Sequence, residues 1–206
     1  DYKTTPDAPT ATATTQAAAL PLAAWTFDAT PAAPSTPTSI AANYGNQLTA
    51  MFYADGTNGS SLWASTASNP QLSAFGGSTL NDPRPVPVSG NAIALANNSA
   101  NGQSVVLKFS MNGYENPILT FSTRGTSTGF NTHQWAWSTD NVTYSDFGTN
   151  TANTTSTFLL RTLDLGSIDA VDQAAEVYVR LTVSGATGAT GNNRIDNIVL
   201  DATPAT

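Results

Sequence analysis

The acidic residues near the two ends of the sequence are the side chains best suited to bind a metal ion. Asp28 follows the first aromatic segment, WTFD, and Asp196, Asn197 and Asp201 lie in the last strand-like segment, NNRIDNIVLD. Carboxylate and amide oxygens are ligands that Ca²⁺ prefers, and jelly rolls often bring their first and last strands side by side. We therefore predict that these four side chains lie close together around a structural Ca²⁺. The alternative needs no metal: Asp196 accepts hydrogen bonds from Arg194 or from backbone N–H groups.

A second group of side chains, Trp63, His133 and Trp135, could form a surface that binds a glycan. These rings lie among Asn, Gln, Thr and Ser residues, which supply hydrogen-bonding groups. His133, Trp135 and Trp137 are spaced by two, so on a strand they share one face. Trp side chains in such a pattern more often fill a core. The sequence therefore leaves two roles open for these residues, glycan binding and core packing.

Catalysis is not predicted for this chain. His133 is the only histidine, no GxSxG motif accompanies it, and the sequence has no cysteine. No nucleophile motif therefore marks a Ser-His-Asp site around His133, and a zinc site would have to complete its ligands with carboxylates alone. We expect a protein that is not an enzyme and that requires no cofactor.

Short runs of alternating apolar and polar residues recur from Trp25 onward, separated by turns rich in Asn, Gly, Ser and Thr. Such alternation is typical of strands with one buried face. The inward residues predicted for two of the clearest runs are Val105, Leu107, Phe109, Val177, Val179 and Leu181. Lys108, Tyr178 and Arg180 then face the opposite way.

These elements predict the fold class. No segment of a dozen residues keeps a helical apolar period, and a chain of 206 residues is long enough for one conventional core. The sequence therefore predicts an all-β protein, an antiparallel two-sheet β-sandwich that is jelly-roll-like, over residues 25–206.

Residues 1–24 differ from this body. They are rich in Ala, Thr and Pro, and Tyr2, Leu20 and Leu22 are their only large apolar side chains. Such a segment buries too little apolar surface to fold alone, but an extended chain can add to an exposed sheet edge. We predict an extended N-terminal arm that contacts a neighbouring subunit and builds a homopolymer. Packing of the arm along its own body is the alternative.

Charge and composition narrow the classes of partner. The formal net charge is -7 and the seven basic residues are scattered, so nucleic acid is not an expected partner. No run approaches the roughly 18 apolar residues of a membrane span. The composition and the start at Asp1 favour a processed, secreted protein, extracellular or on the cell surface.

Five segments together resemble a known family: WTFD near the start, YADGTNGSSLW (53–63), STRGTSTGFNTHQWAWSTDNVTYSDFGT (122–149), VYVRLTVSGATG (177–188) and NNRIDNIVLDATP (192–204). The family is one of secreted bacterial β-sandwich domains found in large extracellular and surface-anchored proteins. The resemblance runs from about residue 25 to 203 and implies a jelly-roll fold and secretion rather than an activity.

Two functions of different classes follow from the sequence. The first is a non-enzymatic structural subunit of an extracellular filament or matrix, assembled through the N-terminal arm. The second is a carbohydrate-binding or adhesive module of a bacterial surface protein.

Overall fold

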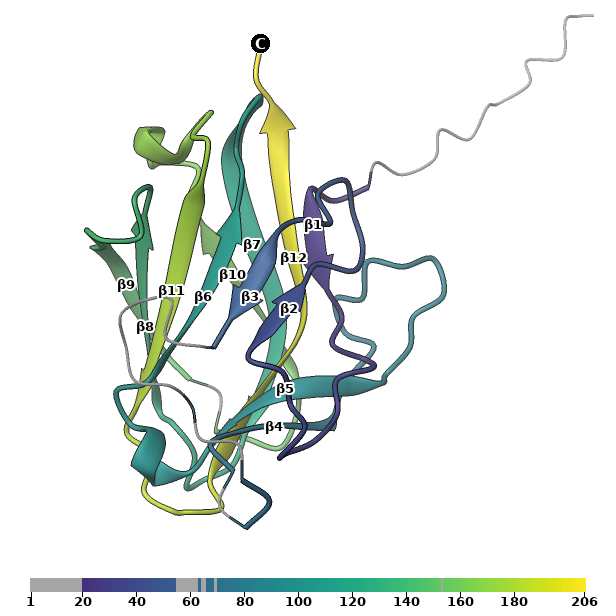
Figure 1. Cartoon of the computed structure of the whole chain (residues 1–206), viewed down its shortest axis with the longest axis vertical. Coiled ribbons are helices and arrows are strands. Elements are labelled where there is room, and N and C mark those ends of the chain that lie inside the picture. The colour runs from purple at the N-terminus through teal and green to yellow at the C-terminus, as the bar shows by residue number, and fades with distance from the viewer. Residues whose placement is uncertain (1–19, 55–62, 64–65, 69, 153) are drawn as a thin grey trace, which may run out of the picture.

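The computed structural model of the chain describes residues 20–54, 63, 66–68, 70–152 and 154–206. These residues form an all-β sandwich of two antiparallel sheets (Figure 1). The strands are β1 (Ala23–Trp25), β2 (Ser39–Ala41), β3 (Met51–Tyr53), β4 (Leu72–Gly76), β5 (Asn91–Ala96), β6 (Ser104–Phe109), β7 (Tyr114–Gly125), β8 (Thr132–Ser138), β9 (Ser145–Thr151), β10 (Leu159–Asp164), β11 (Val177–Ser184) and β12 (Asn192–Pro204). Two single-turn 3₁₀ helices, η1 (Asn98–Ala100) and η2 (Asp169–Val171), connect strands. The predicted fold class is confirmed.

Each sheet is named here after its central long strand. The β12 sheet has the order β10-β7-β12-β5-β4, and β1 also pairs with β12. The β11 sheet has the order β2-β3-β6-β11-β8-β9. The first and last strands of the described chain are therefore neighbours, as the sequence predicted from the usual arrangement of jelly rolls.

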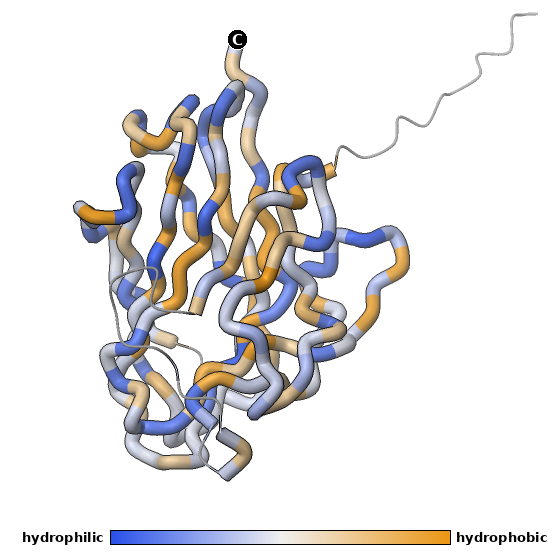
Figure 2. Tube along the Cα trace, viewed as in Figure 1, coloured by the Kyte–Doolittle hydropathy of each residue, from blue (hydrophilic) through white to orange (hydrophobic). Residues whose placement is uncertain are grey.

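The core lies between the two sheets and follows the alternation in the sequence. Apolar and polar residues alternate along the strands in Figure 2. Leu107 on β6 lies opposite Val179 on β11, and both side chains are buried. All six residues predicted to face inward are buried in the structure: Val105, Leu107, Phe109, Val177, Val179 and Leu181. The predicted inward face is confirmed.

Strand β12 changes its neighbour part of the way along its length. Residues 192–195 pair with β5, whereas Ile198, Val199 and Leu200 pair with β1. The register with β7 shifts between Asp196 and Val199, which marks a bulge. Asp196 and Asn197 are therefore left without a strand partner on the β5 side, and their side chains can bond to another segment.

The body begins slightly before Trp25. The backbone N–H of Leu22 donates to the carbonyl oxygen of Leu200 over 2.8 Å, and strand β1 starts at Ala23. Residues 1–19 lie outside the described part of the chain. No helix within the described part has the length and hydropathy needed to cross a membrane.

Candidate functional site

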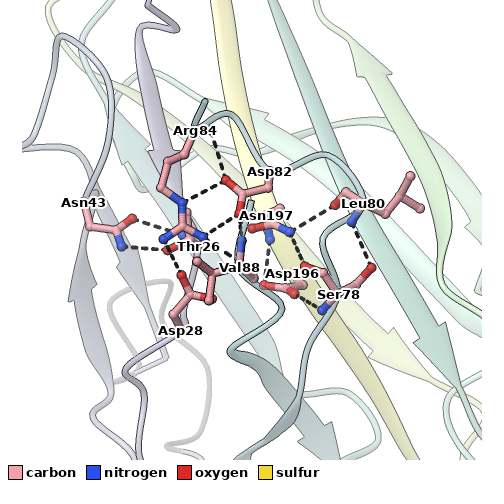
Figure 3. A network of polar contacts seen from close by, with 10 residues as sticks. All are labelled: Thr26, Asp28, Asn43, Ser78, Leu80, Asp82, Arg84, Val88, Asp196 and Asn197. Atoms are coloured by element: carbon pink, nitrogen blue, oxygen red, sulfur yellow. Dashed lines mark hydrogen bonds and ion pairs between the residues drawn. The ribbon is translucent and has the colours of Figure 1, made fainter. Parts of the chain in front are cut away.

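The loop between β4 and β5, residues 77–90, is called the strap here because it crosses β12 at the bulge (Figure 3). The N–H of Ser78 donates to Oδ2 of Asp196 over 2.7 Å. In return, Nδ2 of Asn197 donates to the carbonyl oxygens of Ser78 and Leu80, over 2.8 and 3.0 Å. The side chains of Asp196 and Asn197 therefore form hydrogen bonds with backbone groups of the strap that have no partner in a strand.

Close backbone contact makes this arrangement depend on glycine. The N–H of Gly77 donates to the carbonyl oxygen of Gly90 over 3.0 Å, which closes the base of the strap. A Cβ at Gly77 would collide with the carboxylate of Asp196, and a Cβ at Gly90 would collide with that of Asp28. The two carboxylates therefore flank one glycine pair, so Asp28 and Asp196 lie near each other.

Arg84 of the strap supplies the positive charge in this network. Its Nη1 lies 2.6 Å from Oδ2 of Asp28, and its Nε donates to Oδ1 of Asp82 over 2.8 Å. Asp82 also accepts from the N–H of Val88 over 2.9 Å. Burial opposes ionisation of Asp82, but the hydrogen bonds from Arg84 and Val88 prevail and lower its pKa. A guanidinium ion thus bridges two loops, β1–β2 and β4–β5, above the bulge.

The residues predicted to bind calcium are only partly brought together. Asp28, Asp196 and Asn197 belong to the strap network, whereas Asp201 lies further along β12, opposite Ile118 of β7. Within the described ranges, no group of three or more His, Cys, Asp or Glu side chains could hold a metal ion. Calcium at this place stays a prediction without support.

The metal-free alternative fits the hydrogen bonds of Asp196. Its two carboxylate oxygens accept from the backbone N–H groups of Ser78 and Asn197, over 2.7 and 2.9 Å. Arg194 does not contribute, because its Nη1 donates to the carbonyl oxygen of Gly76 instead. Backbone donors of this kind stabilise a buried carboxylate without a metal.

Two buried groups titrate in the same pH range with opposite effects on stability. Burial raises the pKa of Asp196 to about 7, with help from the charges of Asp28 and Asp82, so the folded state keeps a proton that the unfolded state has lost. Burial, with the charge of Arg161, lowers the pKa of His133 to about 4. Acidification from pH 7 to 4 therefore stabilises the fold through Asp196 and destabilises it through His133.

The variants Asp196→Asn and His133→Gln should separate these two effects. Without Asp196 only the destabilising contribution of His133 remains, so Asp196→Asn loses more stability than the wild type between pH 7 and 4. His133→Gln keeps only the stabilising contribution of Asp196 and so gains stability relative to the wild type over this range. The two variants diverge by the sum of the two contributions, on the order of 5 kcal/mol. Urea denaturation at a series of pH values measures both. Parallel pH profiles for all three proteins would contradict the assignment.

The residues predicted to bind a glycan do not offer a binding surface. Trp63 and Trp135 are each 4% exposed and His133 is 2% exposed. Nε1 of Trp63 donates to the carbonyl oxygen of Ser104 over 2.7 Å, and the ring of Trp135 packs 5.5 Å from that of Phe121 between centroids. Burial of all three side chains corrects the expectation that a sugar stacks on them and favours the core-packing alternative.

An outward surface of the β11 sheet carries a different set of aromatic and charged residues. We define the tyrosine–arginine face as the outward-directed side chains of Tyr53, Lys108, Tyr144, Tyr178 and Arg180. Tyr178 is covered by its neighbours and only 7% exposed, whereas the other four are partly exposed. The alternation in the sequence already placed Lys108, Tyr178 and Arg180 opposite the core side chains. It gave no sign that Tyr53 and Tyr144 lie beside them, because those contacts join distant segments.

The strand register explains how this face is assembled. Val106 on β6 lies between Tyr53 on β3 and Arg180 on β11. The guanidinium carbon of Arg180 lies 3.9 Å from the ring centroid of Tyr144, which follows β8. Since neighbouring strands lie about 4.8 Å apart, Tyr53 and Arg180 are about 10 Å apart across the sheet.

A second row of this face is held by charge. Nζ of Lys108 lies 2.6 Å from Oε1 of Glu176 and 5.6 Å from the ring centroid of Tyr178. Glu176 also accepts a hydrogen bond from the hydroxyl of Tyr178. The hydrogen bonds from Lys108 and Tyr178 lower the pKa of Glu176. These contacts hold Lys108, Glu176 and Tyr178 in place as the polar border of the face beside Arg180.

The residues predicted for assembly are divided between core and surface. Leu22 is 4% exposed and belongs to the core of its own subunit, so its side chain is not free to contact a neighbour. Leu20 is 49% exposed, and together with Tyr114 and Pro204 it lines a cavity of about 230 Å³. Tyr2 lies outside the described residues, and assembly through the arm stays a prediction.

Comparison with known proteins gives structural likeness only. No family model and no curated protein matches the sequence. Similar solved structures include the CBM22-1 xylan-binding domain of Paenibacillus barcinonensis Xyn10C (7% identity, 92% of this chain and 100% of that chain, TM-score 0.48). A further example is a CBM61 module in complex with β-1,4-galactotriose (10% identity, 64% of this chain and 82% of that chain, TM-score 0.42). Another is the K1 cleaved adhesin domain of Lys-gingipain from Porphyromonas gingivalis (8% identity, 64% of this chain and 83% of that chain, TM-score 0.43). These comparisons bear on the fold and not on an activity or a ligand of this chain.

Proposed function

We propose that this protein is a secreted, non-catalytic carbohydrate-binding module of a bacterial surface or extracellular protein, and that it holds a neutral glycan on the tyrosine–arginine face. The observation that carries the proposal is the stacking of Arg180 on Tyr144 in a row that leads to Tyr53. A tyrosine ring offers an apolar face and one polar hydroxyl, which can match a sugar ring with its apolar C–H face and its rim of hydroxyls.

The hydrogen-bonding groups of this face support the proposal. Arg180 has no carboxylate partner among the described residues. Its Nε is buried, so only the N–H groups of its two terminal nitrogens could donate to sugar hydroxyls. Gln134 on β8 and Thr149 on β9 lie opposite each other on the same sheet and add an amide and a hydroxyl. A face of tyrosine rings, a guanidinium group and neutral polar groups, bordered by the Lys108–Glu176 ion pair, offers partners for a polyhydroxylated ligand.

Affinity electrophoresis and calorimetry with xylan, β-1,4-galactan and mannan test this proposal. The wild type should bind at least one of these polymers. Tyr144→Ala should weaken that binding by about tenfold or more, because it removes the ring and releases Arg180 from its position.

Val142→Ala is the matched control, since Val142 lies in the same turn and is 82% exposed. This variant should bind as the wild type does, and melting curves check that all three proteins are folded. Failure of the wild type to bind any neutral glycan, or full binding by Tyr144→Ala, would refute the proposed function.

A further inference from the structure

Two Asn-Gly dipeptides lie in described turns of the same conformation. Asn101–Gly102 occupies the centre of the η1 turn (residues 100–103), and Asn112–Gly113 occupies the centre of the β6–β7 turn (residues 111–114). In each turn the N–H of the last residue donates to the carbonyl oxygen of the first, over 3.0 and 2.8 Å respectively. The glycines have φ angles of 88° and 80°, and neither asparagine has a positive φ, so both are type II turns. A third such dipeptide, Asn58–Gly59, lies outside the described residues.

An asparagine that precedes a glycine can lose its side-chain amide without an enzyme. The backbone nitrogen of the glycine attacks Cγ of the asparagine, a new N–Cγ bond forms, the Cγ–Nδ2 bond breaks, and ammonia leaves with the proton of the backbone nitrogen. Water then opens the resulting succinimide ring on either side of its nitrogen. Cleavage of the bond to Cγ gives aspartate, and cleavage of the bond to the main-chain carbonyl carbon gives isoaspartate. Glycine favours the first step because it has no Cβ to hinder rotation of its peptide unit.

The η1 turn is restrained against this reaction. Nδ2 of Asn101 donates to the carbonyl oxygen of Ala186 over 2.9 Å, and Oδ1 of Asn101 accepts from the N–H of Ala186 over 2.9 Å. The attacking nitrogen is engaged as well, because the N–H of Gly102 donates to the carbonyl oxygen of Val183 over 2.8 Å. Both reacting groups must therefore give up hydrogen bonds before they can approach each other.

The β6–β7 turn lacks these restraints. Asn112 is exposed, and its side-chain amide forms no hydrogen bond with any residue that the structure describes. The N–H of Gly113 likewise donates to no acceptor in the described part of the chain. Rotation of this peptide unit toward Cγ of Asn112 therefore breaks no hydrogen bond of either reacting group.

We propose that Asn112 is a site of spontaneous modification, which deamidates through a succinimide to aspartate and isoaspartate while Asn101 is protected by its contacts. The two turns share the dipeptide and the turn type and differ in the hydrogen bonds of the reacting groups. This modification goes beyond the proposed function and does not depend on it, since Asn112 is not part of the tyrosine–arginine face.

Isoaspartate at this position should loosen the end of β12. The carbonyl oxygen of Gly113 accepts from the N–H of Ala205 over 2.9 Å. Tyr114 is in register with Pro204 of β12. Isoaspartate inserts one extra carbon atom into the main chain before Gly113, so the hydrogen bond from Tyr114 to Met111 cannot keep its geometry. The last residues of β12 therefore lose an anchor in the modified protein.

Peptide mapping by mass spectrometry, after the whole chain is incubated in warm, mildly alkaline buffer, tests the proposed site. Fragmentation assigns each deamidated asparagine and separates aspartate from isoaspartate. In the folded protein Asn112 should convert at least about tenfold faster than Asn101, because the η1 turn must break its hydrogen bonds before each attack. In urea, which removes the folded structure, the two should convert at similar rates, since both precede a glycine.

Asn112→Asp is the matched variant for the effect on β12, because it carries the charge of the product without the extra main-chain carbon. The amide of Ala205 should exchange its hydrogen faster in the isoaspartate form than in freshly purified Asn112→Asp. Equal conversion of Asn112 and Asn101 in the folded protein, or conversion of Asn112 in urea alone, would overturn the proposed site. Equal exchange at Ala205 in the isoaspartate form and in Asn112→Asp would overturn the proposed effect on β12.

Discussion

Leu107→Ala should lower the free energy of unfolding by about 2–5 kcal/mol. Leu107 is 3% exposed and lies between Phe52 of β3 and Val179 of β11 in the register of the β11 sheet. Because strands on both sides fix the backbone, the structure cannot collapse fully into the space that the side chain leaves. The loss therefore includes a contribution from the cavity as well as the lost burial.

Urea denaturation followed by tryptophan fluorescence measures this loss, with an unchanged dependence on urea concentration as the sign that only stability has changed. Val86→Ala is the control, because Val86 is 77% exposed on the strap. The control should change stability by less than about 0.5 kcal/mol. A similarly small change for Leu107→Ala would contradict the placement of this face in the core.

The inward and outward faces of the strands could be predicted from the sequence because side-chain direction alternates with every residue. Leu107, Val179 and Lys108 therefore fell on the correct sides from the local pattern alone. The same pattern placed Trp135 and His133 on one face but could not tell which face was inside. Pairing decides this: Trp135 lies opposite Leu181, a core residue, and directly opposite residues share a face.

The candidate sites were less accessible to prediction because they join segments far apart in the chain. The approach of Asp28 to Asp196 could be predicted from the common pairing of first and last strands. Arg84 could not, because the position of a proline-rich loop has no periodic pattern. The contact of Arg180 with Tyr144 joins residues 36 positions apart and depends on the pairing of β8 with β11, which no local pattern encodes.

Arg84→Leu should destabilise the protein by about 3 kcal/mol, the second large effect that we expect. The change leaves Asp28 and Asp82 without their shared cation, and the side chain of Asp82 is fully buried. Breaking a buried ion pair by removing one partner costs about 3–5 kcal/mol, and the 25% exposure of the Arg84 side chain places the effect at the low end. The strap should also become more accessible to proteases, since Arg84 joins it to the β1–β2 loop.

A second variant and a chelator make this prediction specific. Adding Asp28→Asn to Arg84→Leu removes one of the two uncompensated charges, so the double variant should recover part of the lost stability. A double-mutant cycle then gives the coupling energy between Asp28 and Arg84. If Arg84 supplies the charge that holds the loops together, EDTA leaves the melting temperature of the wild type unchanged. Two results together would instead assign that role to a bound metal ion: EDTA lowers the melting temperature of the wild type, and Arg84→Leu loses less than about 0.5 kcal/mol of stability. A tightly held cation would then compensate the two carboxylates without the arginine.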